Sequence, residues 1–412
     1  MHRWFVAGAL AAASIVPATA VGEEPAQDVR TKGQEQERRQ LEEQIAKELG
    51  QGAAATAPEP AAASAQPAAQ AGTGGLGPLA RLVLLPDISA IGSFAGVYDS
   101  WDAGRLSPRS GPTGPAGKPA FLFQELELGL QSVVDPYVRA DVFVSFGRDG
   151  SASVEEAYAT TLGLPAGLQL RAGTFFTPIG RVNSTHPHTW DFLDAPLAHD
   201  RIVSGDKLAG PGVDASWLAP LPWFAEVHLV AQSTAPFEGD PERLTGTARV
   251  SQLFALSDAA TAGVGLTATR RDEGTGAFRD VAAVDLFAKY RPPAGRAYLT
   301  LQGELYARRF RGAGPADTGD GWGAYAQLFW RQGAWLGYGV RWDRAPAADP
   351  LAPASLAGGV ERRWSAVGDW FATEFQRLGL QIGWDRRPDG ADGWEALLHY
   401  EFIIGAHGAH PF

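Results

Sequence analysis

The stretch from residue 282 to residue 290 reads Ala-Ala-Val-Asp-Leu-Phe-Ala-Lys-Tyr. In an extended chain its small or apolar side chains occupy one face and its charged side chains the other, because strand side chains alternate with a period of two. Similar segments recur from Pro86 to Ile404. A membrane β-barrel shows this pattern with apolar residues toward lipid and polar residues toward a watery lumen. The repeated alternation therefore predicts an all-β protein.

About 16 such segments can be marked out, and single-chain bacterial barrels have an even number of strands. The short connections are Asp135-Pro136, Leu164–Gly167, Ala219–Pro222, Ser257-Asp258 and Arg291–Gly295. The long ones cover residues 99–120, 177–211, 233–244, 310–321 and 345–361. Outer-membrane barrels carry short turns on the periplasmic rim and long loops outside. The expected fold is a transmembrane antiparallel β-barrel of about 16 strands.

Tryptophans support this fold over a soluble β-sandwich, which turns its apolar faces inward onto a shared core. Aromatic rings of this kind collect at the membrane–water boundary. The tryptophans at or near expected strand ends are Trp217, Trp223, Trp322, Trp330, Trp335, Trp342, Trp384 and Trp394.

The N-terminal part divides into three expected segments before a barrel over residues 86–412. Residues 1–20 have a basic start, a short apolar run and a small-x-small end, which predict a cleavable signal peptide. Residues 21–50 are charged and helix-prone, with Leu41, Ile45 and Leu49 at four-residue steps. This segment is either a brief coiled coil or a solvated, partly helical stretch. Residues 51–85 are rich in Ala and Pro and predict a disordered linker.

Composition narrows the location and the partners. The chain has no cysteine, which excludes disulfides and thiolate sites, and its net charge of -11 argues against nucleic acid. We expect a bacterial outer-membrane protein in contact with lipid, with its N-terminal extension in the periplasm. The alternating last strand and the terminal Phe412 resemble the assembly signal of outer-membrane proteins, although Gly405–Pro411 separates them. The barrel-assembly machinery is therefore an expected partner.

Charged residues assigned to the inner face form the expected pore wall, where rings of charge set ion preference. Both signs are mixed, so the alternative that acids and bases pair across neighbouring strands stays open. The expected wall residues are Glu125, Glu127, Arg139, Asp141, Arg171, Glu226, Arg249, Asp285, Lys289, Glu304, Arg308, Arg341, Asp343, Asp385 and Glu401.

The longest connection, residues 177–211, is the third on the long-loop side. Long loops in compact domains tend to be functional, and its mixed charges and aromatics suit a loop folded into the lumen; a loop that covers the outer mouth is the alternative. The expected constriction residues are Arg181, His186, His188, Trp190, Asp191, Asp194, His199, Asp200 and Arg201. His186 and His188 invite a metal site, but no full ligand set is visible, so we expect no metal and no cofactor.

Three segments carry a family resemblance: Glu156-Ala157-Tyr158, the stretch Leu-Gln-Leu-Arg-Ala-Gly-Thr-Phe-Phe-Thr-Pro-Ile-Gly at 168–180, and Asp206–Val213. Together they resemble the porin O and P family of phosphate-selective porins. The resemblance implies a sixteen-stranded barrel, usually trimeric, with a constriction loop and in some members a charged periplasmic extension. The lysine and arginine ladder of an anion-selective pore is not apparent, and Asp206-Lys207 replaces the expected arginine, so phosphate selectivity is not implied.

The expected function is a channel for passive or weakly selective diffusion of small hydrophilic solutes or ions. An envelope tether through residues 23–50 is an alternative. A receptor-like barrel is another, because Thr373–Leu378 resembles a turn of TonB-dependent receptors, but a full receptor has a 22-strand barrel with a plug. A barrel hydrolase would need a serine near His228 or His399, and the pattern shows none. We therefore expect no enzymatic activity.

Overall fold

The structure is a computed structural model that describes residues 86–100, 112, 115, 117–203, 207–234, 244–274, 276–311, 320–346, 359–388 and 390–405. The signal peptide, charged segment and linker expected at residues 1–85 lie outside these described residues, as do Asp206, Phe412 and most of the long connections.

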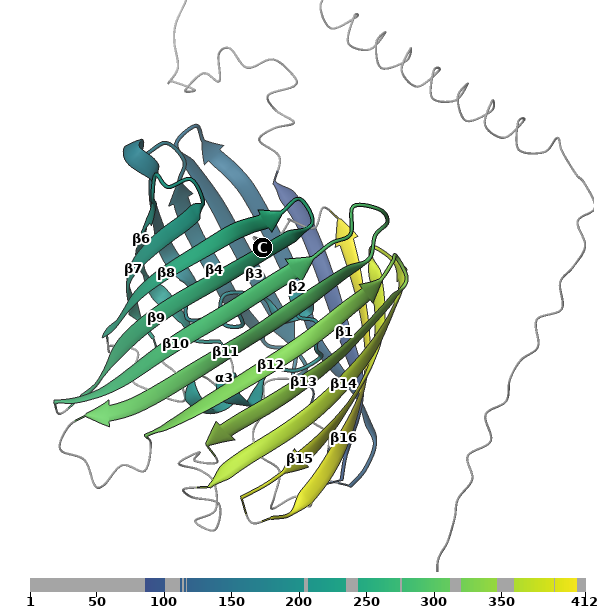
Figure 1. Cartoon of the computed structure of the whole chain (residues 1–412). Coiled ribbons are helices and arrows are strands. Elements are labelled where there is room, and N and C mark those ends of the chain that lie inside the picture. The colour runs from purple at the N-terminus through teal and green to yellow at the C-terminus, as the bar shows by residue number, and fades with distance from the viewer. Residues whose placement is uncertain are drawn as a thin grey trace, which may run out of the picture. The chain divides into compact units, whose positions relative to one another are not determined.

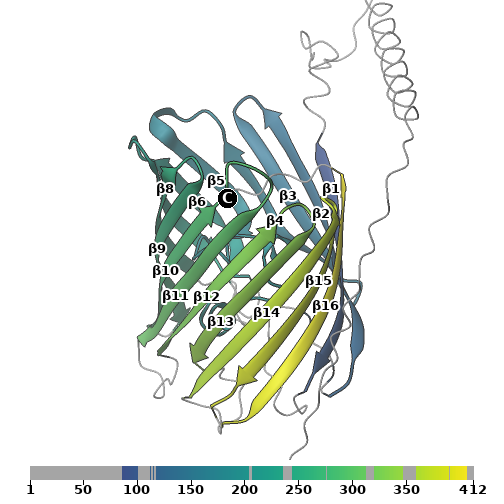
Figure 2. The same ribbon diagram turned by 45° about the vertical axis from the view of Figure 1, so that its right-hand side comes forward.

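The described residues form sixteen strands in one closed sheet (Figures 1 and 2). The first eight are β1 (Asp87–Asp99), β2 (Ala120–Asp135), β3 (Val138–Gly147), β4 (Ala152–Thr161), β5 (Leu168–Phe176), β6 (Ala209–Leu218), β7 (Phe224–Ser233) and β8 (Leu244–Ser257). The rest are β9 (Ala260–Gly274), β10 (Ala277–Tyr290), β11 (Tyr298–Arg311), β12 (Gly321–Gln332), β13 (Leu336–Pro346), β14 (Val360–Thr373), β15 (Gln376–Arg386) and β16 (Asp392–Gly405). Short helices are η2 (Pro165–Gly167), η3 (Pro187–Thr189) and α3 (Leu197–Ile202).

Every strand pairs antiparallel with its neighbour in sequence. The ring closes where β1 pairs with β16, from Ser89 opposite Gly405 to Asp99 opposite Glu395. Closure leaves no row of unpaired backbone groups, which is the condition for a sheet to span lipid. The predicted 16-strand antiparallel barrel is confirmed.

Burial alternates residue by residue, and β15 shows the pattern most clearly. Its outward side chains Leu378, Leu380 and Ile382 are 38%, 49% and 53% exposed. Its inward side chains Arg377 and Gln381 are 8% and 0% exposed. A soluble protein buries its apolar side chains, so this reversal matches a barrel whose outer face contacts lipid. No helix among the described residues is long and apolar enough to cross a membrane.

The short turns gather on one rim, the upper rim in Figure 1, where β1 begins and β16 ends. The opposite rim carries the long connections, but three of its connections, those from β3 to β4, from β9 to β10 and from β15 to β16, are short. Between β3 and β4, Asp149 Oδ1 accepts hydrogen bonds from the Ser151 backbone N–H and hydroxyl, around Gly150 with a φ of 79°. The β9–β10 connection is a second tight hairpin. The expected alternation of loop lengths is therefore less regular than the sequence suggested.

The connection from β5 to β6, residues 177–208, enters the barrel and is called the inner loop below. Its helix α3 packs against β11, β12 and β13 inside the ring of strands (Figure 1). All six residues of α3 are buried. A core of Ile179, Ile202 and Leu208 from the inner loop with Val281 and Tyr306 from the wall anchors it there. The alternative of a loop that only covers the outer mouth does not match this packing.

Candidate functional site

The inner loop begins with a turn that only glycine permits. Gly180 has a φ of 66°, and a Cβ at this position would overlap the Glu304 carboxylate. That carboxylate accepts the backbone N–H groups of Arg181 and Val182 at 3.1 and 2.9 Å. The close approach of backbone to β11 therefore fixes the direction in which the inner loop enters the lumen.

Asn183 closes the base of the inner loop. Its Nδ2 donates to the carbonyls of Thr177 and Leu208 at 2.8 and 2.9 Å, and its Oδ1 accepts the Leu208 N–H at 2.9 Å. One buried side chain thus joins the two ends of the segment. His199 of α3 lies 3.1 Å from the same Oδ1, which ties the helix to the base as well.

Asp194 fastens the middle of the inner loop to β13, β14 and β15. Its Oδ1 lies 2.7 Å from Arg341 Nη2 and accepts Gln381 Nε2 at 2.6 Å, and its Oδ2 lies 2.7 Å from Arg363 Nη1. Burial alone would raise the pKa of Asp194, but the two guanidinium groups outweigh it and lower the pKa to about 2. The carboxylate therefore stays charged and holds two buried arginines in place.

Arg377 on β15 holds the adjacent stretch by its backbone. It donates to the carbonyls of Trp190 and Asp191, both at 2.8 Å. The Asp191 carboxylate is itself buried, and burial raises its pKa to about 6. The Thr300 hydroxyl donates to it at 3.3 Å. Asp191 is therefore a residue of the inner loop whose charge changes in a mildly acidic solution.

The inner loop also touches the opposite wall, through His186. His186 Nδ1 lies 2.9 Å from Glu127 Oε2 on β2, and its Nε2 lies 3.0 Å from Glu156 Oε2 on β4. Burial disfavours the charged ring, but hydrogen bonds to Glu127, Glu155 and Glu156 raise the pKa of His186 well above its usual range. With Asp194 on one side and His186 on the other, the inner loop spans the interior.

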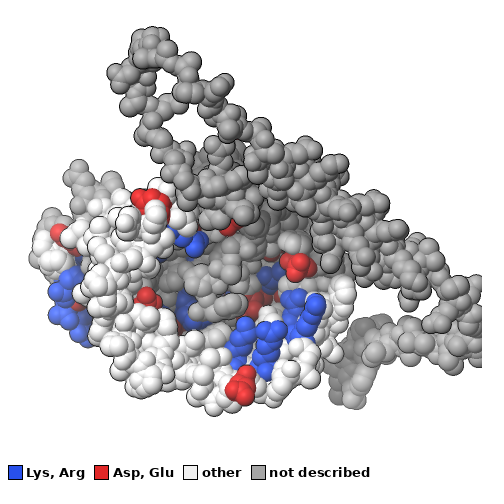
Figure 3. Space-filling view, turned by 90° about the horizontal axis from the view of Figure 1, so that it is seen from above, with Lys and Arg blue, Asp and Glu red and all other residues white. Residues whose placement is uncertain are grey.

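A cavity of about 470 Å³ remains between the inner loop and the wall from β1 to β7, and is called the vestibule below. Arg139 pairs with Asp141 at 2.7 Å, and Arg171 pairs with Asp214 at 2.9 Å. His228 lies 3.1 Å from Asp214 and 3.2 Å from Glu226. Charges of both signs thus line the vestibule in neighbouring pairs, some between adjacent strands, such as Arg171–Asp214, and some within one strand, such as Arg139–Asp141. Figure 3 looks onto the short-turn rim, where basic and acidic side chains are also mixed.

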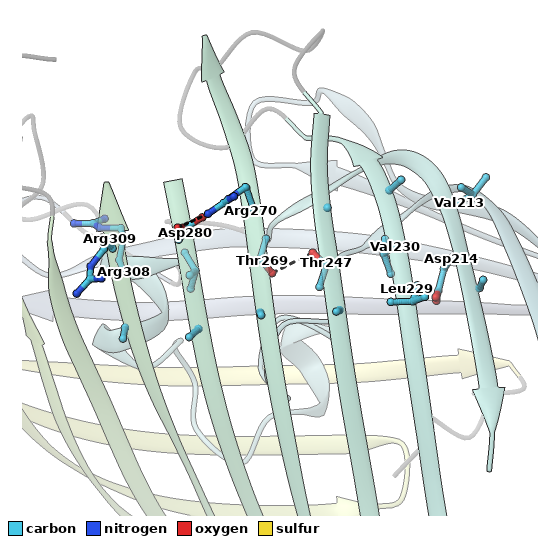
Figure 4. Close-up of a pocket in the computed structure, with 18 of the residues that line it drawn as sticks. Val213, Asp214, Leu229, Val230, Thr247, Thr269, Arg270, Asp280, Arg308 and Arg309 are labelled. Atoms are coloured by element: carbon cyan, nitrogen blue, oxygen red, sulfur yellow. Dashed lines mark hydrogen bonds and ion pairs between the residues drawn. The ribbon is translucent and has the colours of Figure 1, made fainter. Parts of the chain in front are cut away.

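A larger concavity, about 1220 Å³, lies along the wall from β5 to β12 and is lined mainly by outward-facing residues such as Val213, Leu229 and Ala248 (Figure 4). At one end Arg270 pairs with Asp280 at 2.7 Å, close to Trp322. Apolar side chains followed by charges and an aromatic ring are typical of the edge of a membrane-spanning band. This concavity therefore belongs to the outer surface and not to the lumen.

The structure places the sequence-predicted residues as follows. Arg181, His186, His188, Trp190, Asp191, Asp194, His199, Asp200 and Arg201 all lie on the inner loop. The expected wall residues all lie on the inner face, in three groups. Glu127, Arg139, Asp141, Arg171 and Glu226 lie at or beside the vestibule, Glu304, Arg308, Arg341 and Asp343 hold the inner loop, and Glu125, Arg249, Asp285, Lys289, Asp385 and Glu401 lie elsewhere on the wall. Arg249 and Asp285 pair with each other at 2.6 Å.

Sequence reasoning missed several inward residues that hold the inner loop. Glu156, Arg363 and Arg377 are 6%, 0% and 8% exposed. Two arginines are consecutive here, so charge alone does not show that Arg363 is the one that faces inward. The exposed side chains at every second residue from Trp364 onward place Arg363 on the inner face. The sequence suggested a turn at Arg377, whereas in the structure β15 begins at Gln376 and includes Arg377. Glu156 was noticed only for its family resemblance.

The structure also corrects the statement that no serine lies near His228 or His399. Ser216 on β6 pairs directly opposite His228 on β7. Ser93 Oγ on β1 lies 2.8 Å from His399 Nε2 on β16. The pair forms only through barrel closure, which brings residues 306 positions apart together. The Nδ1 atom of His399 has no hydrogen-bond partner among the described residues. Without a group that orients the ring, the pair does not form a nucleophile–base–acid set.

Comparison with known proteins places the chain in a family without naming its activity. No family model matches the sequence. An uncharacterized protein of Aquifex aeolicus (strain VF5) is 30% identical over 393 residues, with 81% of each chain covered. The chain belongs to the same family as this Aquifex protein.

Solved structures share its fold at low sequence identity. OprB of Pseudomonas putida has a TM-score of 0.55 at 9% identity, with 79% of this chain and 95% of that chain covered. The outer membrane channel DcaP of Acinetobacter baumannii has a TM-score of 0.53 at 10% identity, with 77% and 97% covered. An anion-selective porin from Comamonas acidovorans has a TM-score of 0.52 at 8% identity, with 77% and 99% covered. The barrel is thus similar to those of outer-membrane channels.

Proposed function

We propose that this protein is an outer-membrane channel through which small hydrophilic solutes or ions diffuse passively and with weak selectivity. The observation that carries the proposal is the inner loop. It enters a closed barrel, fastens to β11, β13, β14 and β15, and leaves the polar vestibule along β1–β7. A folded segment that narrows a lumen while leaving a polar passage beside it is what a diffusion channel needs.

Weak selectivity follows from the charges beside that passage. Asp141 and Asp214 each have a basic partner within 3.0 Å, Arg139 and Arg171 respectively. Paired charges cancel most of each other's field at distances beyond a few ångströms, so neither cations nor anions meet a ring of one sign. The unpaired ladder of bases that would concentrate an anion is not seen among the described residues of the vestibule.

Single-channel recording in planar bilayers tests the proposal. Purified, refolded protein should give discrete conductance steps, and deletion of residues 186–200 should raise the step size because it removes the part of the inner loop that spans the lumen. Asp280→Asn, on the outer surface, is the matched control and should leave the step size unchanged. Folded protein that gives no steps would refute the channel.

Finer features are part of the same proposal. We place the barrel in the outer membrane as a homotrimer inserted by the barrel-assembly machinery, with a signal peptide at 1–20 and a periplasmic extension at 21–85. The porin O and P family is the proposed wider relation, on the strength of Glu156–Val213. No enzymatic role is proposed, because the Ser93–His399 pair lacks an orienting group.

A further inference from the structure

Four side chains meet where the inner loop touches β2 and β4. This His–Glu cluster consists of Glu127, His186 and His188, whose ligand atoms lie within 4.8 Å of one another, with Glu155 beside His186. Pro187 starts the 3-10 turn η3, which stacks the two imidazole rings with centroids 5.5 Å apart and an interplanar angle of 24°. The turn thereby directs both rings toward Glu127, although the two histidines do not share a helix face.

The separations in the His–Glu cluster match those of ligands around one metal ion. Glu127 Oε2 lies 2.9 Å from His186 Nδ1 and 3.6 Å from His188 Nδ1, and Glu155 Oε2 lies 3.4 Å from His186 Nδ1. Metal–ligand bonds of about 2.1 Å in a tetrahedron place neighbouring ligand atoms roughly 3.4 Å apart. The observed distances bracket that value. The two imidazoles and the Glu127 carboxylate form a donor set suited to a first-row transition metal and not to calcium or magnesium, and Glu155 lies beside it.

A β-bulge brings the second carboxylate to the cluster. Opposite β3, Glu156 pairs with Phe143 and Val154 pairs with Val144, so Glu155 is an extra residue on β4. A bulge re-aims the side chains next to it and is often found beside functional sites. In this case it lets two consecutive glutamates approach His186 from the same strand.

The surroundings of His186 resemble the outer shell of a metal site. Its Nδ1 faces the cluster, while its Nε2 lies 3.0 Å from Glu156 Oε2. Glu156 is fixed in turn, because its Oε1 accepts the Phe176 N–H at 2.9 Å. A metal-bound histidine usually donates its second ring N–H to a carboxylate that is itself hydrogen-bonded. Nδ1 therefore faces the cluster, and a metal ion bound there would displace the proton that Nδ1 carries in its ion pair with Glu127.

The Glu127 carboxylate of the cluster is buried between the two imidazole rings. Glu127 is 2% exposed, and its Oε2 faces the Nδ1 atoms of both His186 and His188. Burial of a carboxylate is costly without a positive partner, and a bound cation supplies one.

We propose that the His–Glu cluster binds one divalent transition-metal ion of the Zn²⁺ class. The ion would join the inner loop to β2 and β4, opposite the attachment that Asp194 makes to β13–β15. Because Glu127 and His186 also line the vestibule, the bound ion would sit at the edge of the proposed passage. Its role would be to fix the width of that passage, not to perform chemistry on a solute.

Zinc content tests the proposal without relying on conductance. The full chain, folded in detergent micelles, is equilibrated with Zn²⁺, freed of excess metal and analysed by mass spectrometry, with affinity measured by calorimetry. The informative variants are His188→Gln and Glu127→Gln, which remove ligands, and Glu156→Gln, which removes the outer-shell partner. His228→Gln is the control, because His228 lies in the same vestibule between two carboxylates but has no second imidazole beside it. Circular dichroism checks that each variant has folded.

We expect one tightly held zinc ion per chain in the wild type and in His228→Gln. Each ligand variant should lose that ion, and Glu156→Gln should bind it about 10- to 100-fold more weakly. A folded wild type that retains no zinc would overturn the site and identify the cluster as an ion pair only. Zinc retained equally by the two ligand variants would also overturn it.

Discussion

Replacing Asp194 by alanine should release the inner loop from β13–β15 and cost the protein a large part of its stability. The carboxylate contacts Arg341 and Arg363, which are 1% and 0% exposed. Removing one partner of a buried ion pair leaves uncompensated charge and typically costs about 3–5 kcal/mol. The lowered pKa of Asp194 points the same way, because the two guanidinium groups favour the charged form of the carboxyl in the folded protein.

The same shift predicts a pH dependence. The folded-state pKa of Asp194 lies below the unfolded value, so its contribution to the free energy of unfolding is complete above about pH 4. It should be lost as the pH falls toward 2, when the carboxylate becomes protonated in the folded state. The acid-induced decrease in stability should therefore be smaller in Asp194→Ala than in the wild type.

Guanidinium unfolding of the barrel in lipid vesicles, followed by tryptophan fluorescence, measures the change. We expect the free energy of unfolding of Asp194→Ala to fall by about 3–5 kcal/mol, and channel currents to become larger and noisier. The matched control is Asp280→Ala, which breaks the more exposed Arg270–Asp280 pair on the outer surface and should cost only about 0–1 kcal/mol. Equal losses in the two variants would refute the assignment of Asp194 as the main attachment.

Two further predictions concern the inner loop. Gly180→Ala should lower the free energy of unfolding by about 2 kcal/mol or more, because it adds backbone strain and displaces Glu304. Gly150 has a similar φ but open space where a Cβ would lie, so Gly150→Ala should cost only about 1 kcal/mol. Denaturant titration of both variants checks this, and equal costs would contradict the role of the Gly180–Glu304 contact. The second prediction concerns Asp191, whose pKa burial raises to about 6. Asp191 becomes negatively charged as the pH rises through that value, so the reversal potential should shift toward cation preference between pH 5 and pH 7. The shift should be smaller in Asp191→Asn, and an identical shift would remove Asp191 from the constriction.

The fold could be predicted from the sequence because each strand carries the evidence in its own residues. The outward series Leu378, Leu380, Ile382 and the inward series between them need only a period of two. The path of the inner loop could be anticipated from its length and mixed polarity alone. Loop lengths were less informative, since Asp149-Gly150-Ser151 makes a tight turn on a rim where long loops were expected.

The contacts of the site could not be predicted in the same way, because they join residues far apart in the sequence. His186 meets Glu127 only when the inner loop crosses the lumen, and Glu155 reaches it only through a bulge on β4. Ser93 meets His399 only when the first and last strands pair. The inward direction of Arg363 could be predicted from its neighbour Trp364, but its ion pair with Asp194 could not.

Reversal potential across a salt gradient, measured on single conducting channels, tests the central claim most directly. The account predicts discrete steps with a reversal potential close to zero, because the vestibule charges are paired. Folded protein that gives no steps would contradict the channel. A potential near the limit for a single permeant ion would contradict the passive, weakly selective passage.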